Sequence, residues 1–118
     1  MLRTVLIAGL MLSGMAGQAS AAVLDGRWSV LIVTEKGDCD RAYRYEINVA
    51  DGRIKYVGEG SFDFTGTVAG NGAVKVSVAK AGQHASGSGR LNGSAGTGAW
   101  SGADPSGACG GRWEAERR

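Results

Sequence analysis

Proline, histidine and cysteine are scarce in this chain of 118 residues. Proline occurs once, at Pro105, histidine once, at His84, and cysteine twice, at Cys39 and Cys109. Two distant thiols and one imidazole do not make a zinc site, so we expect no metal and no cofactor. Acid–base catalysis needs a positioned partner, and a nucleophile elbow, a Walker loop and a zinc-binding helix are all missing. We therefore expect a non-enzymatic protein without catalytic residues.

An excess of charge of one sign is also lacking. Thirteen Lys and Arg against eleven Asp and Glu give a formal net charge of +2. Nucleic-acid binding needs a basic face that neutralises phosphates, so this balance argues against a nucleic-acid partner. No apolar run is long enough for a transmembrane segment. The expected partner is a small molecule or another protein, of unknown identity.

The first 21 residues have the pattern of a secretory signal peptide. Arg3 supplies a positive start, residues 5–15 are mainly apolar, and residues 19–21 read Ala-Ser-Ala, a small-x-small cleavage sequence. We expect cleavage after Ala21 and one mature domain of residues 22–118. The expected location is the periplasm or the extracellular space.

The two cysteines predict a disulfide. An even number of cysteines in a small exported protein is typical of such a crosslink, here between Cys39 and Cys109. It would close most of the mature chain into a loop, worth about 4 kcal/mol in the chain-entropy model. That is comparable to the whole net stability of a small domain.

Short alternating segments predict strands. Apolar and polar side chains alternate with a period of two between clusters of Gly, Asn and Asp, and no stretch of the mature chain has the period of an amphipathic helix. The predicted fold class is all-β: a single antiparallel up-and-down barrel of about eight strands, closed by its first and last strands. A two-sheet β-sandwich is the alternative. The expected strands cover residues 27–34, 42–50, 62–68, 74–78, 83–91, 94–101 and 111–116. A further strand begins at residue 53, directly after the turn at 51–52.

Turn sequences predict the register of two hairpins. A two-residue type I′ turn at 51–52 places Val49 opposite Ile54. A two-residue loop at 71–72 would send the apolar side chains of its two strands to opposite faces. We therefore expect a three-residue loop with a glycine bulge at 70–72.

A third hairpin is expected to turn at 92–93, with Leu91 opposite Ser94. This register aligns four glycines as a ladder on one face of two adjacent strands. Glycine inside strands costs stability, so the ladder fits a place where a bulky group approaches the backbone or where the sheet coils sharply. The four are Gly87, Gly89, Gly96 and Gly98.

Three Trp, three Tyr and two Phe accompany the glycines. These side chains, including Phe62 and Phe64, can pack over the ladder and fill the barrel. The alternative is a lined cavity in which Trp and Tyr hold a small apolar or flat ligand. The predicted ligand-binding residues are Trp28, Tyr43, Tyr45, Tyr56, Trp100 and Trp113.

Besides ligand binding, two other functions stay open: binding of a partner protein, through loops or the outer face, and a structural role. The connection at 35–40 and the segment 104–107, joined by the disulfide, would form a rigid rim suited to inhibiting a secreted or periplasmic hydrolase. Leu31 and Val33 are expected to point outward, as an apolar surface for a partner protein. A structural, envelope-associated protein is the third possibility.

Gly26-Arg27-Trp28 at the start of the first strand resembles the G-x-W entry of calycin-type barrels such as avidins, lipocalins and bacterial metalloprotease inhibitors. The resemblance implies a small β-barrel. Residues 29–31 read Ser-Val-Leu where avidins have polar ligand-contacting residues, so biotin binding is not implied. The whole string, ending in residues 109–113 (Cys-Gly-Gly-Arg-Trp), also resembles small exported bacterial proteins with no assigned activity.

Overall fold

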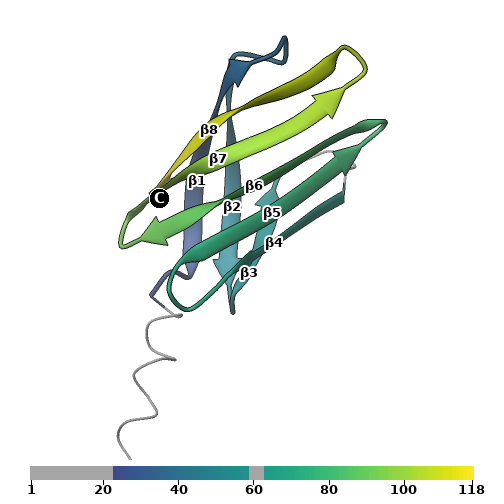
Figure 1. Cartoon of the computed structure of the whole chain (residues 1–118). Coiled ribbons are helices and arrows are strands. Elements are labelled where there is room, and N and C mark those ends of the chain that lie inside the picture. The colour runs from purple at the N-terminus through teal and green to yellow at the C-terminus, as the bar shows by residue number, and fades with distance from the viewer. Residues whose placement is uncertain (1–22, 59–62) are drawn as a thin grey trace, which may run out of the picture.

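Short connections join consecutive strands, so each strand pairs with its neighbour along the chain. A computed structural model describes residues 23–58 and 63–118. Its eight strands follow one another around a closed antiparallel barrel in which β1 also pairs with β8 (Figure 1). The strands are β1 (Gly26–Lys36), β2 (Ala42–Ala50), β3 (Arg53–Val57), β4 (Asp63–Val68), β5 (Ala73–Lys80), β6 (Gln83–Asn92), β7 (Ala95–Asp104) and β8 (Gly107–Arg117).

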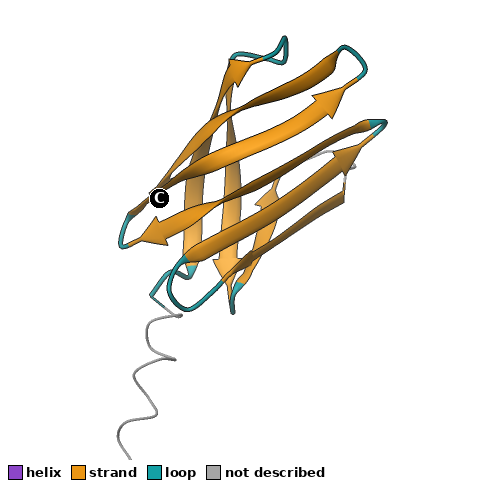
Figure 2. Ribbon diagram, in the orientation of Figure 1, coloured by secondary structure: helices purple, strands orange, loops and turns teal. Residues whose placement is uncertain are grey.

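The barrel confirms the predicted fold class, and the two-sheet sandwich is not formed. Outside the grey trace, Figure 2 shows only strands and loops. Among the residues described, no helix is long and apolar enough to cross a membrane. The predicted signal peptide, residues 1–21, lies outside the described residues, as does Phe62.

Turn chemistry sets the first two registers as the sequence predicts. Asp51 and Gly52 have φ of 52° and 76°, which is the type I′ requirement, and Val49 lies opposite Ile54. At the next tight connection, Val68 lies opposite the first valine of β5. The loop between them spans residues 70–72, so the three-residue loop is confirmed.

The predicted register of the third hairpin is wrong by two residues. Asn92 lies opposite Ala95, so the turn residues are Gly93 and Ser94. Gly93, with φ of 66°, takes the first turn position, where a type II′ turn favours glycine. A shift of two residues keeps every side chain on the same face, so alternation alone does not exclude it.

The corrected register also breaks up the predicted glycine ladder. Gly89 lies opposite Gly98, but the other two glycines lie opposite bulky residues. Gly87 is opposite Trp100, and Gly96 is opposite Leu91. Small and large side chains therefore alternate along the pair β6–β7, which lets the large ones lie over the small ones.

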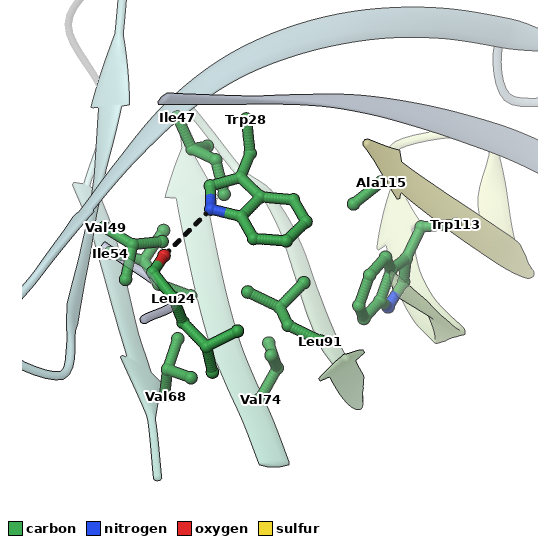
Figure 3. Packing of buried hydrophobic residues seen from close by; sticks show 10 residues of the cluster. All are labelled: Leu24, Trp28, Ile47, Val49, Ile54, Val68, Val74, Leu91, Trp113 and Ala115. Atoms are coloured by element: carbon green, nitrogen blue, oxygen red, sulfur yellow. Dashed lines mark hydrogen bonds between the residues drawn. The ribbon is translucent and has the colours of Figure 1, made fainter. Parts of the chain in front are cut away.

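The apolar core fills the barrel end that holds the turns at 51–52 and 93–94. Trp28 has no exposed surface, and its indole Nε1 donates a hydrogen bond to the Leu24 carbonyl at 3.0 Å (Figure 3). Leu24 precedes β1 and covers this end. The cluster consists of Leu24, Trp28, Ile47, Val49, Ile54, Val68, Val74, Leu91, Trp113 and Ala115.

A disulfide holds the opposite end at the closure of the barrel. Cys39, in the β1–β2 connection, is bonded to Cys109 of β8 with a Cα–Cα distance of 6.1 Å. The predicted pairing is therefore confirmed. Such a crosslink is compatible with an oxidising, exported environment.

The joint between β3 and β4 is the shortest in the barrel wall. Among the described residues, only two register pairs join these strands: Arg53 with Thr67, and Ile54 with Gly66. Beyond them the two strands diverge (Figure 1).

Candidate functional site

Four aromatic rings form a continuous row on the inward face of β2, β3 and β4. Tyr43 and Tyr45 meet edge to face with ring centroids 5.2 Å apart, and Tyr45 meets Tyr56 in the same way at 5.7 Å. Phe64 follows, 6.4 Å from Tyr56. We call Tyr43, Tyr45, Tyr56 and Phe64 the aromatic row. Edge-to-face contacts of this kind fix ring orientations.

The aromatic row is not enclosed like the core. Tyr43 is 36% exposed, and the other three rings are half-buried. Burial, followed by the neighbouring Tyr43, raises the pKa of Tyr45 well above its ordinary value. The Tyr45 hydroxyl is hydrogen-bonded to that of Tyr43 and stays neutral well into the alkaline range. Three of the four rings, Tyr43, Tyr45 and Tyr56, are among the predicted ligand-binding residues.

The row borders a hollow where β3 and β4 part. The hollow has a volume of about 490 Å³, within the range of small-molecule sites. Its lining alternates between residues that face the barrel interior and residues that face outward, so it lies at the gap between the two strands. We call it the wall opening; it is lined by Arg53, Ile54, Lys55, Tyr56, Gly58, Phe64, Thr65, Gly66 and Thr67.

Two of the predicted ligand-binding residues lie in the core instead. Trp28 is fully buried. Trp113 is 7% exposed, and its indole Nε1 donates to the Ser88 carbonyl at 3.2 Å. Burial removes both rings from any surface that a ligand can touch, so we leave them out of the candidate site.

Trp100 lies on the other side of the barrel from the aromatic row. Its indole Nε1 donates to the Val33 carbonyl at 3.0 Å, across β8. The ring lines a second hollow of about 450 Å³ beside Cys109. The structure thus brings Tyr43, Tyr45 and Tyr56 together, and it places the three tryptophans elsewhere.

The polar lining of the wall opening has no counterpart among the predicted site residues. Arg53, Lys55, Thr65 and Thr67 alternate with the inward residues of β3 and β4, so they lie on the outward face. No local signal in the sequence marks them, because their place beside the opening depends on how β3 separates from β4.

Two connections meet at the disulfide. The Cys39 sulfur lies 3.6 Å from a carboxylate oxygen of Asp104, next to the β7–β8 turn. The other Asp104 oxygen accepts hydrogen bonds from the backbone and hydroxyl of Ser106 and from the Gly107 backbone. These bonds, led by that from the Ser106 hydroxyl, lower the pKa of Asp104. The predicted rim is thus a pair of contacting loops.

The remaining candidates lie on the outer face. His84 is exposed on β6, opposite Ala79 and Ala103. Among the described residues, no three His, Cys, Asp or Glu side chains gather as a metal site. Leu31 is half-buried between Arg44 and Glu114, so charged neighbours interrupt the apolar outer face of β1.

Comparisons with known proteins assign no family, because no family model, curated protein or solved structure matches the chain. The fold shown by the structure is a small antiparallel barrel of eight strands. The resemblance to calycin-type barrels stays a prediction.

Proposed function

We propose that this is an exported, non-enzymatic binding protein that holds a small flat or apolar ligand at the aromatic row and the wall opening. The observation that carries the proposal is the row itself. In a barrel filled only by its own side chains, these rings would be fully buried. Instead they stay half-buried and in mutual edge contact beside a hollow of about 490 Å³, which suits a ligand-binding surface.

The arrangement offers a ligand both contact area and orientation. A flat ligand in the wall opening can pack on Tyr56 and Phe64, the two rings of the row that line it, and Tyr43, which is 36% exposed, offers further aromatic surface at the other end of the row. Ile54, at the base of the wall opening, is 4% exposed and supplies an apolar floor. The hydroxyls of Thr65 and Thr67, which line the opening, can orient a polar atom of the ligand.

A neutral fluorescent probe tests this function. We would titrate the oxidised protein with N-phenyl-1-naphthylamine, whose emission rises in apolar surroundings. The variant Tyr43→Ala/Phe64→Ala removes both ends of the aromatic row, and we expect it to bind about tenfold more weakly, a loss of about 1.4 kcal/mol. The matched control is Trp100→Phe, an aromatic change at the second hollow, which should leave the affinity unchanged.

Three results would overturn this function. The first is no binding by the wild-type protein at the solubility limit of the probe. The second is equal affinity in the wild type and in Tyr43→Ala/Phe64→Ala. The third is a loss in Trp100→Phe as large as that in the double variant, which would move the site to the other side of the barrel.

A second candidate function is inhibition of a secreted or periplasmic hydrolase through the disulfide-joined loops. The contact between Cys39 and Asp104 favours it, because a preorganised pair of loops loses little entropy when it enters a cleft. Inhibition of one hydrolase from a panel, reduced by Asp104→Ala and unaffected by Tyr43→Ala, would support this function over ligand binding. Inhibition of none would reject it.

A further inference from the structure

The charged side chains of the barrel are divided between two sides. All the ion pairs in the described part of the chain join residues of β1, β2, β8 and the adjacent C-terminal Arg118. The closest are Arg112 with Glu35 at 2.9 Å, and Arg27 with Glu46 and Arg112 with Glu114, both at 3.1 Å. This side therefore carries charges of both signs, and several of its cations are paired with acids.

The outer face of β3 to β6 has a different charge pattern. In the described structure, Asp63 is the only acidic side chain on these four strands. The cations that point outward there make no ion pair with any described residue. This group of cations, which we call the basic face, comprises Arg53, Lys55, Lys75 and Arg90.

Two members of the basic face line the wall opening. Arg53 and Lys55 both point outward from β3, at the outer margin of the hollow whose inner part is formed by Tyr56 and Phe64. Thr65 and Thr67 add hydroxyl donors across the same hollow. A cation pair, two hydroxyls and two aromatic rings thus surround a single space.

This juxtaposition defines the ligand class. We propose that the ligand is an amphipathic anion: its flat or apolar body enters the wall opening against Tyr56 and Phe64, and its carboxylate, sulfonate or phosphate group binds Arg53 and Lys55. The inference rests on the proposed function and adds the charge of the ligand. The guanidinium of Arg53 can donate two parallel hydrogen bonds to such a group, and Lys55 adds a second positive charge.

A matched pair of probes isolates the contribution of charge. 8-Anilino-1-naphthalenesulfonate and N-phenyl-1-naphthylamine share the same arylamine body, and only the first carries a sulfonate. We expect the folded wild-type protein to bind the sulfonate about tenfold more tightly at low salt. The preference should shrink as added salt screens the charges.

Two double variants locate the charge contribution. Arg53→Gln/Lys55→Gln should abolish the preference for the sulfonate and leave the affinity for the neutral probe unchanged. The control Lys75→Gln/Arg90→Gln removes the same two kinds of charge from the same face, outside the wall opening, and should keep the preference. Near-UV circular dichroism checks that each variant is folded before titration.

The outcomes separate the charge of the ligand from the function itself. Binding of the neutral probe without any preference for the sulfonate would overturn the inference and leave the proposed function standing. A preference that survives in Arg53→Gln/Lys55→Gln, or that the control variant loses to the same extent, would also overturn it. Binding of neither probe would overturn both proposals.

Discussion

Gly98 on β7 leaves the space that the indole of Trp113 on β8 occupies. The two residues lie directly opposite each other, and a Cβ at Gly98 would be 2.5 Å from the indole Cε2. The ring therefore crosses β7 and reaches the Ser88 carbonyl of β6. The missing side chain is what allows a tryptophan to lie flat against the wall.

Trp100 makes the same kind of crossing in the opposite direction. Its indole lies over Gly111 of β8 and donates to the Val33 carbonyl of β1. Each of these two tryptophans thus joins its own strand to the strand two positions away around the barrel, β8 to β6 for Trp113 and β7 to β1 for Trp100. Glycines lower the stability of these strands because they lose more conformational entropy on folding. The aromatic surface that they allow to be buried offsets this loss of stability.

The first prediction concerns this space. Gly98→Ala should lower the free energy of unfolding by about 2 kcal/mol, because the added methyl group overlaps Trp113 and the Ser88 carbonyl. Gly70→Ala is the control: no atom lies within 4 Å of a Cβ there, so we expect a change within about 0.5 kcal/mol. Urea unfolding followed by tryptophan fluorescence measures both. Equal effects would contradict the account.

The second prediction concerns the β5–β6 turn. Ala81 has φ of 45°, a left-handed conformation that costs an alanine about 1 kcal/mol. Ala81→Asn should raise the free energy of unfolding by about that amount, because asparagine tolerates this conformation. The converse change, Asp51→Ala at φ of 52°, should be destabilising. Urea unfolding measures both, and effects of the same sign would reject the explanation.

The third prediction concerns the disulfide. Cys39 and Cys109 are 70 residues apart in the sequence, so their bond restricts much of the unfolded chain. Cys39→Ser/Cys109→Ser should lower the free energy of unfolding by about 4 kcal/mol in the chain-entropy model. Equilibrium unfolding of the oxidised wild type and of the double variant gives the difference. A loss below about 1 kcal/mol would show that this model does not apply here.

The fourth prediction concerns alkaline pH. Burial raises the pKa of Tyr45 in the folded protein above its ordinary value of 10.0. As the pH rises past that value, the unfolded chain loses the Tyr45 proton first, so the free energy of unfolding should fall. Tyr45→Phe should make this fall shallower. Urea unfolding between neutral and alkaline pH measures the two slopes, and identical slopes would contradict the assignment.

Much of the barrel follows from local chemistry. The alternation in β2 and the Asp51-Gly52 turn specify both the faces and the register of the first hairpin, and the three-residue loop at 70–72 follows from the faces alone. The turn at Gly93-Ser94 does not follow, because two neighbouring turn sequences differ by a register shift of two, which preserves the faces. Local alternation cannot rank them.

The candidate site is less visible in the sequence. Alternation predicts that Tyr43, Tyr45 and Tyr56 share the inward face. It does not predict which inward rings become core. Trp28 is buried because Leu24 covers its end of the barrel, whereas no equivalent segment among the described residues covers Tyr43. The proposed roles of Arg53 and Lys55 depend on the separation of β3 from β4, which involves non-local pairing.

The sequence by itself determined the strands, their inward and outward faces, most of the turns and the pairing of the only two cysteines, because these depend on the period of two and on residues close in the chain. Only the tertiary structure decided which end of the barrel is packed, how the tryptophans cross their neighbours and where the wall opens. Those outcomes depend on how strands distant in sequence share a limited interior volume, which no local pattern encodes.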